Sequence, residues 1–508
     1  MATPAEKLAT SLEVLKEMQD KGITAIRSSD ITRTHRERLT KGGFLKEVMK
    51  GWYIPARPDE NLGESTAWFT SYWDFCAAYL TERFGSDWSL SPEQSLHLHA
   101  GNQTVPIQLL VRAVKARNQV TELAYRTSIL EVRANLPAKN DCYTDDHGLK
   151  LFSLPSALLN SFEDFYVRNP VDARTVLATF RDASGILELL LDGGHSVIAG
   201  RISGAFRNIG RDRIADDIIK GMGAAGYNIR ELDPFTAPSP IVINPRELSP
   251  YVNRLKLMWQ SMRNTVIENF PPEPGLPKDK EAYLNQVKDN YTKDAYNSLS
   301  IEGYRVSIEL IERVRSGQWE PENNEVDRQQ RDAMAARGYW QAYQQVLESI
   351  EKILNGANGG EMVDYDHQEW YREMFAPSVA AGILKASDLA GYRNQPVFIR
   401  RSQHVPPSAE AVRDLIPTFF ELLATEEHAG VRAVLGHFIF VYIHPYIDGN
   451  GRIGRFLMNT MLASGGYPWI VIPFERRVEY MAALETASTQ QDIGLFSQFI
   501  SSLILKFR

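Results

Sequence analysis

Two helix-like segments meet at a short loop rich in proline and glycine, and this junction constrains the chain more than any other feature. Residues 431–443 are apolar on nearly every side, which predicts a buried helix. Pro445 disfavours helical backbone in the preceding residue, so this helix should end near His444. A second helix is predicted from about Gly451, because its residues repeat at helical spacing: Ile453, Phe456, Leu457, Thr460 and Met461. The chain must therefore turn from one helix into another within a tight loop.

The loop itself, His-Pro-Tyr-Ile-Asp-Gly-Asn-Gly-Arg, carries groups suited to phosphate chemistry. Gly449 and Gly451 allow successive backbone N–H groups to converge on an anion. The N-terminus of the following helix adds its positive dipole at the same place. The reactive or charged side chains of this stretch are His444, Asp448, Arg452 and Arg455. One histidine, one aspartate, an anion cradle and two arginines within twelve residues predict a site for phosphoryl or nucleotidyl transfer.

The same glycines also match G-x-G-x-x-G, the pattern of dinucleotide-binding βαβ units, from Gly449 to Gly454. That pattern needs its first glycine directly after a strand, whereas HPYID intervenes here. The apolar segment upstream is also too long for a typical buried strand. A dinucleotide-binding unit is therefore not expected.

Residues 444–455, HPYIDGNGRIGR, are similar to the signature of Fic (Fido) domain enzymes, H-P-F-x-[DE]-G-N-G-R-x-x-R. Tyr446 in place of phenylalanine is the one departure at a fixed position. The likeness extends from about residue 280 to about residue 500. It implies a mainly α Fic fold with a small β-hairpin flap in the C-terminal half. It also implies a protein adenylyltransferase, which moves AMP from ATP to a Ser, Thr or Tyr hydroxyl of a target protein or of the enzyme itself.

The resemblance assigns a role to each residue of the signature. His444 would be the general base that takes the proton from the attacking hydroxyl, a task that suits an imidazole with a pKa near neutrality. Asp448 would hold Mg²⁺ on the ATP phosphates, because this cation prefers carboxylate oxygen. The phosphates would be bound by the run Gly449, Asn450, Gly451, Arg452, Ile453, Gly454 and Arg455. Arg452 and Arg455 would neutralise the charge that accumulates as pyrophosphate leaves.

A second motif lies about 140 residues upstream, in NSLSIEGYRVS. Ser298 to Gly303 match [ST]-x-x-x-E-[GN], which resembles the inhibitory motif of Fic proteins with an N-terminal inhibitory helix. By this resemblance Glu302 pairs with Arg455 and takes the place of the γ-phosphate contact, because a carboxylate on the guanidinium competes with the phosphate. Glu302 could also position water for the reverse reaction, the removal of AMP. The open alternative is an ordinary glutamate on a helix surface.

The resemblance also assigns roles to the flap and to two residues near the C-terminus. Residues 391–407 resemble the family's flap, in which Val397, Phe398 and Ile399 would pair with the target's backbone as an added strand. Arg400 and Arg401 stand where many relatives carry Gly-Gly or Gly-His, which leaves the target preference open. Tyr480 is placed where relatives pack the adenine, and a core aromatic is the alternative. Ser488 stands where many relatives have asparagine, so the contact to ribose or base differs.

The N-terminal half predicts two further modules. Residues 1–58 resemble a winged helix-turn-helix, with a helix from about Ile31 that stops at Gly42 and a two-stranded wing about Gly51. Residues 27–57 contain eight basic and three acidic residues, a local net charge of +5 that suits DNA binding. The alternative to a DNA-binding module is a protein-interaction module. Residues 59–240 form a mixed α/β region similar to antitoxins of type IV toxin–antitoxin systems (AbiEi-like). His97 and His99 there, two apart in a predicted strand, are more often structural than a metal pair.

The composition and the proline-rich boundaries predict the class of protein and its division into domains. The net charge of -7 argues against a basic coat over the whole molecule, and two cysteines allow no disulfide framework or four-thiolate zinc site. The longest apolar run is too short to span a bilayer, so a soluble cytoplasmic protein is expected. A homodimer is a family expectation. The predicted modules are residues 1–58 (winged helix), 59–240 (antitoxin-like), 250–364 (helical, with the inhibitory helix) and 365–508 (Fido catalytic domain), with a proline-rich seam from Pro234 to Pro245.

Two hypotheses of different class remain. The first is an autoinhibited adenylyltransferase whose N-terminal modules choose its target. The second is a DNA-binding regulator or toxin–antitoxin component whose Fic domain senses nucleotide. Because His444, Asp448 and both arginines are present, the sequence favours the enzyme.

Overall fold

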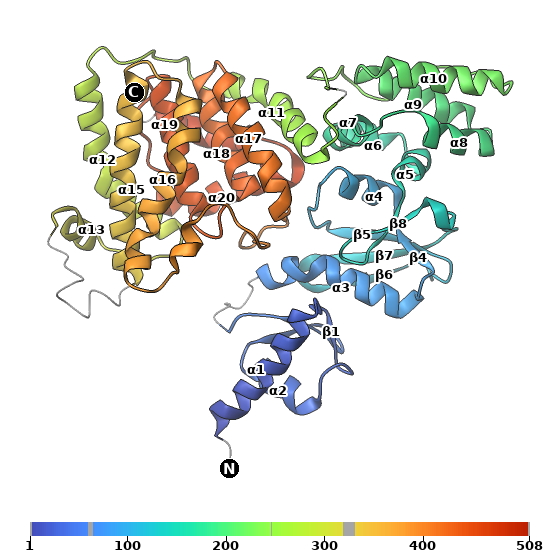
Figure 1. The fold of residues 1–508 in the computed structure, drawn as a ribbon, viewed down its shortest axis with the longest axis horizontal. Helices are drawn as coiled ribbons and strands as arrows, with labels where there is room; N and C mark the ends of the chain where they lie inside the picture. Colours follow the sequence, from blue (N-terminus) through green and yellow to red (C-terminus); the bar gives the residue numbers. More distant parts are fainter. Residues whose placement is uncertain (1–2, 59–64, 245, 318–330, 506–508) are drawn as a thin grey trace. The chain divides into compact units, whose positions relative to one another are not determined.

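The computed structural model describes the chain except residues 1–2, 59–64, 245, 318–330 and 506–508, and it divides into two compact units (Figure 1). The first unit contains residues 1–254 together with 398–405, and the second contains 255–397 and 406–508. Both are mainly helical, and all three sheets of the described residues lie in the N-terminal half. Among the described residues, no helix combines the length and the apolar character that a membrane span requires. The fourfold division predicted above stays a prediction.

The first unit begins with a small helical module that carries a three-stranded sheet. Its elements are α1 (Pro4–Asp20), β1 (Ile26–Arg27), α2 (Arg33–Lys41), β2 (Leu45–Met49) and β3 (Trp52–Pro55). Thr32 caps α2 by accepting the N–H of His35, and Gly43 takes a left-handed φ of 77° where the chain leaves the helix. The strands are antiparallel in the order β1-β3-β2, with Gly51 (φ 80°) at the turn of the hairpin. The helix and the two-stranded wing expected from the sequence are both present.

A four-stranded sheet follows, in the order β4-β5-β7-β6, with β5 and β7 parallel. The helices and strands of this part of the chain are α3 (Thr66–Phe84), β4 (Trp88–Leu90), α4 (Pro92–His99), β5 (Gln108–Ala113), β6 (Gln119–Glu122), the 3-10 turn η1 (Ala124–Arg126) and β7 (Ser128–Arg133). The turn η2 (Lys139–Asp141) and the hairpin β8 (Cys142–Thr144) with β9 (Lys150–Phe152) come next. Aromatic residues of α3, among them Trp68, Tyr72 and Phe75, are buried in the core of this part.

The strand predicted at His97 and His99 is wrong, because both residues lie in helix α4. Ser91 caps this helix by accepting the N–H of Gln94, and Pro92 at its first turn has the fixed φ that helices accept. His97 Nδ1 lies 2.5 Å from Asp172, and His99 Nε2 contacts the carbonyl oxygen of Phe152 at 2.8 Å. In the parts of the chain that the structure describes, no cluster of three or more His, Cys, Asp or Glu could hold a metal. Both histidines have structural partners.

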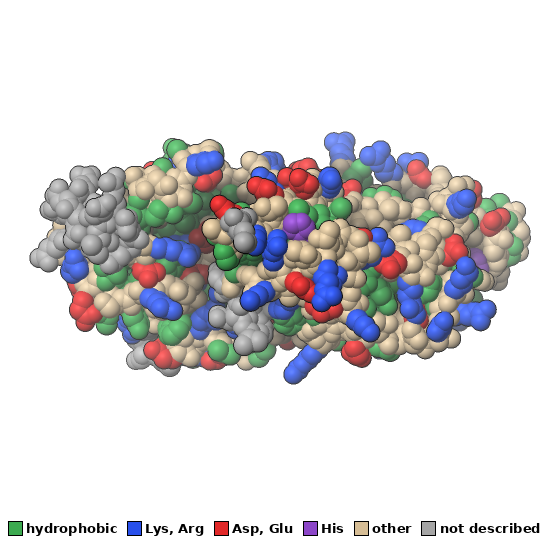
Figure 2. All heavy atoms as spheres, turned by 90° about the horizontal axis from the view of Figure 1, so that it is seen from below, with side chains coloured by type: hydrophobic (Ala, Val, Ile, Leu, Met, Phe, Trp, Pro, Cys, Tyr) green, Lys and Arg blue, Asp and Glu red, His purple; other side chains and the backbone are tan. Residues whose placement is uncertain are grey.

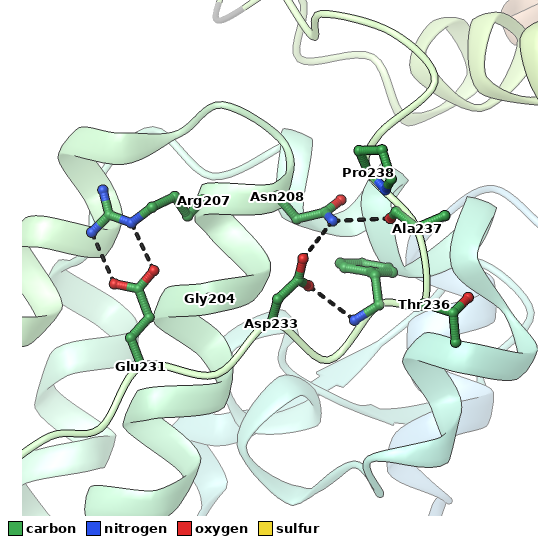
Figure 3. Close-up of a pocket in the computed structure, with 9 residues that line it drawn as sticks. Gly204, Arg207, Asn208, Glu231, Asp233, Thr236, Ala237 and Pro238 are labelled. Carbon is green, nitrogen blue, oxygen red and sulfur yellow. Dashed lines mark hydrogen bonds and ion pairs between the residues drawn. The ribbon is translucent and has the colours of Figure 1, made fainter.

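Six helices end the first unit: α5 (Leu154–Asn160), α6 (Asp164–Arg168), α7 (Pro170–Ala178), α8 (Ser184–Gly193), α9 (Ser196–Asn208) and α10 (Asp212–Ala224). The segment after α10 crosses α9 closely at Gly204, where an added Cβ would lie 2.2 Å from the carbonyl oxygen of Leu232. An open cavity of about 510 Å³ lies beside this crossing (Figure 3). The charged and amide side chains that line it pair with one another: Arg207 contacts Glu231 at 2.7 Å, and Asn208 donates to Asp233 at 2.8 Å. These lining groups are therefore not available as a ligand-binding set.

The second unit is a bundle of helices around α18 and α19. Its elements are α11 (Pro250–Asn269, which contains the boundary), α12 (Lys280–Ile301), α13 (Ile308–Arg315), α15 (Arg331–Leu354), α16 (Gly359–Ala380), η3 (Ala386–Leu389), α17 (Ala409–Thr425), α18 (Ala429–Ile443), α19 (Asn450–Ser464), η4 (Phe474–Arg476), α20 (Arg477–Gln490) and α21 (Gly494–Leu505). Nearly every residue of α18 and α19 is buried, as their apolar sequences predict. The two helices pack closely at Gly436 and Gly454, where an added Cβ would lie 2.8 Å from Leu457 and 2.7 Å from His437. The loop between them is thus fixed at both ends.

The predicted flap differs from expectation, because residues 391–407 contain no strand. The segment reverses between Ile399 and Ser402, with Arg401 at a φ of 62°. Residues 398–405 belong to the first unit, where Gln403 O accepts the N–H of Val105 at 2.9 Å and Thr66 Oγ accepts the N–H of Arg401 at 3.2 Å. The backbone N–H of Arg401 and the carbonyl oxygen of Gln403 are thus bonded to residues of the first unit rather than to the opposite side of a hairpin.

Candidate active site

His444 lies where α18 ends, and a backbone carbonyl group fixes the tautomer of its ring. Its N–H still donates to Phe440 O, but its φ of 53° is left-handed, because Pro445 bars a further helical residue. Its Nδ1 lies 3.0 Å from the carbonyl oxygen of Val441. Since a carbonyl oxygen only accepts, the proton is on Nδ1 and Nε2 is free to accept one. This is the tautomer that a general base needs.

Burial lowers the pKa of His444 below its ordinary value, and the positive charge of Arg393 lowers it further. The carbonyl oxygen of Val441 and the carboxylates of Glu302 and Asp448 oppose these effects without cancelling them. The imidazole is therefore neutral at neutral pH, as a proton acceptor must be.

The loop after His444 is held by the side chain of Asn450. Its amide accepts the N–H of Tyr446 at 2.9 Å and donates to the carbonyl oxygen of the same residue at 2.8 Å. Gly449 precedes α19 with a φ of 83°, and an added Cβ there would lie 2.8 Å from the ring of Phe375. Glycine is therefore needed for both conformation and space. The Asn450 side chain shapes the loop, while the first amides of α19, which have no carbonyl partner within the helix, are oriented to bind an anion.

Asp448 and Arg452 are paired beside these amides. Asp448 Oδ1 accepts the N–H of Gly449 at 2.6 Å, and its Oδ2 lies 3.2 Å from Arg452 Nη2. The aspartate side chain is 60% exposed, whereas the arginine is almost fully buried. One exposed carboxylate fits Mg²⁺, which commonly binds one or two carboxylates, substrate phosphates and water. The donor set at Asp448 is therefore compatible with a metal that arrives with ATP.

Arg455 is engaged by the C-terminal end of α12. Its Nη2 contacts Glu302 Oε1 at 2.7 Å and Ser298 O at 3.1 Å, and its Nε donates to Ser298 Oγ at 2.8 Å. Although burial disfavours the charge of Arg455, the Glu302 carboxylate holds the pKa of this guanidinium above its ordinary value. The fold thus places Ser298 and Glu302 in contact with Arg455, as the sequence motif predicts. These two residues precede Arg455 by 157 and 153 positions along the chain.

Glycines at both partners make room for this contact. Glu302 is the cap residue of α12, and Gly303 follows it with a φ of 90°, which turns the chain away from the helix. At Gly451 an added Cβ would lie 2.4 Å from Glu302 Oε1. The carboxylate therefore lies directly on the first turn of α19, where the amides would otherwise meet a phosphate. Ile453 and Gly454, also predicted near the phosphates, are buried in α19, with Gly454 against His437 of α18.

Tyr480 and Ser488 lie on α20 and are both buried. The Tyr480 hydroxyl lies 2.6 Å from His437 Nε2, and its ring packs against Phe496 and Phe499. Only 1% of Tyr480 is exposed, which fits the alternative of a core aromatic. The adenine and ribose contacts stay predictions. Of the target-pairing residues, Val397 belongs to the second unit and Phe398 and Ile399 to the first.

Three residues near the site were missed by sequence reasoning. The guanidinium carbon of Arg452 lies 5.2 Å from the ring centre of Tyr304 and 5.0 Å from that of Phe375. Asp294 lies two turns before Glu302 on α12, where it accepts the Tyr339 hydroxyl at 2.6 Å. Arg393 donates to the carbonyl oxygen of His444 at 2.7 Å. The spacing of Asp294, Ser298 and Glu302 at intervals of four was the one available signal, since it places them on one helix face.

Residues 363–462 match the model of the Fic/DOC family, so the chain contains a Fic domain across these residues. The chain is 26% identical over 277 residues to a protein adenylyltransferase Fic of Nematostella vectensis, a match that covers 51% of this chain and 59% of that relative. It is 38% identical over 114 residues to the protein adenylyltransferase Fic of Drosophila willistoni, which covers 22% of each. The chain thus spans less than two thirds of these curated relatives.

Solved structures with Fic domains are also similar. Fic-1 (residues 134–508) from Caenorhabditis elegans matches with a TM-score of 0.37 and 18% identity, over 64% of this chain and 90% of that one. A Fic domain containing signaling protein from Bacteroides thetaiotaomicron matches with a TM-score of 0.35 and 19% identity, over 50% and 94%.

Proposed function

We propose that this protein transfers AMP from ATP to a Ser, Thr or Tyr hydroxyl of a target protein or of itself, and that Glu302 holds the transferase inactive. The observation that carries the proposal is the contact of Glu302 with Arg455 on the first turn of α19, beside a histidine whose Nε2 is free. The match to the Fic/DOC family and the names of the relatives support the same reaction.

The residues suggest how the transfer would proceed. His444 Nε2 takes the hydroxyl proton as the target oxygen forms a bond to the α-phosphorus, and the bond to the pyrophosphate oxygen breaks. The amides at the start of α19 and the guanidinium of Arg452 meet the charge on the phosphates. We place Mg²⁺ at Asp448, where it would supply positive charge to the phosphates when bound. The tautomer of His444 is set before substrate arrives, so no reorganisation is needed at that step.

Inhibition follows from competition for one guanidinium. While Glu302 occupies Arg455, the outer phosphate of ATP has neither that partner nor the space in front of Gly451. Holding the activity to about one per cent would require roughly 2.7 kcal/mol in favour of the closed pair, which one partly buried, charge-assisted contact can supply. The same carboxylate could position water for removal of AMP from a modified target.

The decisive experiment compares three proteins with Mg²⁺ and α-labelled ATP: wild type, Glu302→Gly, and Glu302→Gly with His444→Ala. Label on protein with Glu302→Gly, little with wild type and none with the double variant is the expected result. No label in any of them, despite measurable ATP binding, would reject the proposal. The alternative of a nucleotide-sensing regulator is less well supported, and it would require regulation to survive His444→Ala alone.

We also propose that the first 58 residues bind DNA. Helix α2 followed by the hairpin of β2 and β3, with β1 paired to β3, supports this proposal, and Arg33, Lys41 and Lys50 are exposed on helix α2 and the hairpin. Figure 2 shows basic side chains interspersed with acidic ones on one face of the molecule.

Duplex binding measured by fluorescence anisotropy over a range of salt concentrations tests this. Arg33→Ala and Lys50→Ala should each weaken binding and reduce the salt slope by about one. Lys16→Ala, an exposed site on α1, is the matched control. Equal binding by all three variants and wild type, or no binding at low salt, would reject the DNA proposal.

A further inference from the structure

Arg393 is a buried cation beside the catalytic loop, outside both the signature and the inhibitory motif. Only 1% of the residue is exposed. Its Nε donates to the carbonyl oxygen of His444 at 2.7 Å, and its Nη2 to that of Ile443 at 3.3 Å. Its backbone N–H donates to the carbonyl oxygen of Pro445 at 2.9 Å. One residue therefore holds three consecutive carbonyl groups of the turn that carries the proposed base.

This turn needs an external partner. The left-handed conformation of a non-glycine residue such as His444 is costly, and it persists where the surroundings enforce it. The last carbonyl groups of a helix such as α18 also have no partner within the helix. A guanidinium satisfies them and places positive charge at the negative end of the helix dipole. Burial and the nearby Arg413 lower the pKa of Arg393 to about 10, which leaves it charged at neutral pH.

The same guanidinium also holds both ends of the neighbouring segment. Its Nη1 donates to the carbonyl oxygen of Gln395 at 3.3 Å, and its Nη2 donates to that of Pro407. All of these residues belong to the second unit. Both ends of segment 395–407, which contains most of the predicted flap, are therefore bonded to the guanidinium of Arg393, which also bonds to the backbone of His444.

We propose that Arg393 is a positioning residue for AMP transfer, whose guanidinium fixes the left-handed turn at His444 and ties both ends of segment 395–407 to it. Arg393 acts through His444 and through the segment, and the inference rests on the transferase activity proposed above. A lysine cannot replace it, because its ammonium lacks the planar fork that reaches several carbonyl groups at once.

The test uses full-length protein with Glu302→Gly, so that the transferase is measurable, and adds Arg393→Lys or Arg393→Gln. We expect kcat to fall by roughly tenfold to a hundredfold in both, with KM for ATP within about twofold, because a displaced base slows chemistry without removing phosphate contacts. Arg413→Gln is the matched control. Arg413 is a neighbouring arginine that bonds to Ala409 O and Asn394, and it should leave kcat unchanged.

A second readout does not depend on activity. Imidazole ¹⁵N chemical shifts of His444, assigned by their loss in His444→Gln, report which ring nitrogen carries the proton. We expect one tautomer, with the proton on Nδ1, in the parent and in Arg413→Gln, and a mixture of tautomers in both Arg393 variants. A role in packing alone would lower the unfolding temperature and leave this tautomer unchanged.

A kcat within about twofold of the parent in Arg393→Lys, or a loss confined to KM for ATP, would overturn the proposal. If Arg393→Gln fails to fold, Arg393→Lys decides by the same criteria. If the Glu302→Gly parent labels no protein, the transferase proposal fails, and the ¹⁵N shifts still decide the role of Arg393. An unchanged tautomer in the Arg393 variants would then overturn it.

Discussion

At the scale of single residues, His444 combines two opposing demands. As the proposed general base, it must be buried enough to meet a target hydroxyl without competing water, yet it must accept a proton near neutral pH. Burial and Arg393 lower its pKa, whereas Val441 O, Glu302 and Asp448 raise it. Its ring is held by a backbone carbonyl and leaves Nε2 free. The balance therefore favours the neutral, accepting form.

The pH dependence of the activated Glu302→Gly protein should follow this pKa. A general base works in its neutral form, so activity is present above the pKa of His444 and is lost as pH falls through it. Because that pKa is lowered, and loss of Glu302 removes one group that raises it, the acid limb of kcat/KM should have its midpoint below about 6.5. Adding Arg393→Gln should move the midpoint to higher pH. Rates between pH 5 and 8 test this, and a midpoint above 6.5 in the Glu302→Gly protein would contradict it.

Residues that form one contiguous motif could be predicted, and residues that depend on tertiary contacts could not. The signature placed His444, Asp448 and both arginines correctly in the loop and on α19, and the upstream motif placed Glu302 beside Arg455. Arg393 gave no such signal, because its partners are backbone carbonyl groups, and a carbonyl group carries no sequence identity. Burial of Tyr480 was likewise open, since an aromatic at helical spacing suits both a core and a ligand pocket.

At the scale of elements, one face of helix α12 contacts helices α15 and α19. Asp294, Ser298 and Glu302 follow at intervals of four, so the contact with Arg455 continues into a buried carboxyl group bonded to Tyr339 on α15. Burial raises the pKa of Asp294 to about 6, against the opposing effect of the Tyr339 hydroxyl. Helix α12 therefore contains a carboxyl group that is disfavoured in its charged form.

Replacement of this carboxyl group should change stability in a pH-dependent way. An aspartic acid with a raised folded pKa binds its proton more tightly when folded, so its contribution to stability falls as pH rises from about 4 to about 6. Asp294→Asn can still accept the Tyr339 hydroxyl and lacks this loss. Its free energy of unfolding relative to wild type should therefore increase between pH 4.5 and pH 7, by on the order of 2 kcal/mol.

Urea unfolding at the two pH values measures this difference. Asp289→Asn, on an exposed side of the same helix, is the control and should show no such increase. A constant difference between Asp294→Asn and wild type at both pH values would mean that Asp294 is already charged near pH 4.5.

Two elements departed from the prediction for local reasons. The run around His97 alternates as a strand would, but Ser91 and Pro92 provide a helix start that overrides the alternation. The flap formed its turn at Ile399–Ser402 without the strands, because a ladder needs partners that the sequence does not specify. Period and turn chemistry fix local shape, whereas the partner of a backbone group is decided by the rest of the fold.

At the scale of the whole molecule, the chain passes between the two units three times, at residues 254/255, 397/398 and 405/406. Two of these passages enclose the turn with Arg400 and Arg401, which belongs to the first unit although the residues on either side of it belong to the second unit. Val405 packs against a hydrophobic cluster of the first unit. No sequence pattern predicted this, because the contacting residues are some 300 positions apart, as Arg401 and Thr66 are 335.

Loosening one of these contacts should release the turn. Thr66→Ala removes the oxygen that accepts the N–H of Arg401, and a lost hydrogen bond of this kind is worth about 0.5 to 1 kcal/mol. Trypsin should then cleave after Arg400 or Arg401 about two- to fivefold faster, since cleavage follows the population of the open segment. Thr66→Ser keeps the hydroxyl and should be cleaved at the wild-type rate. Equal rates for all three proteins would mean that the contacts of Gln403 and Val405 hold the turn, so that the first unit restrains it through Val105 and the hydrophobic cluster rather than through α3.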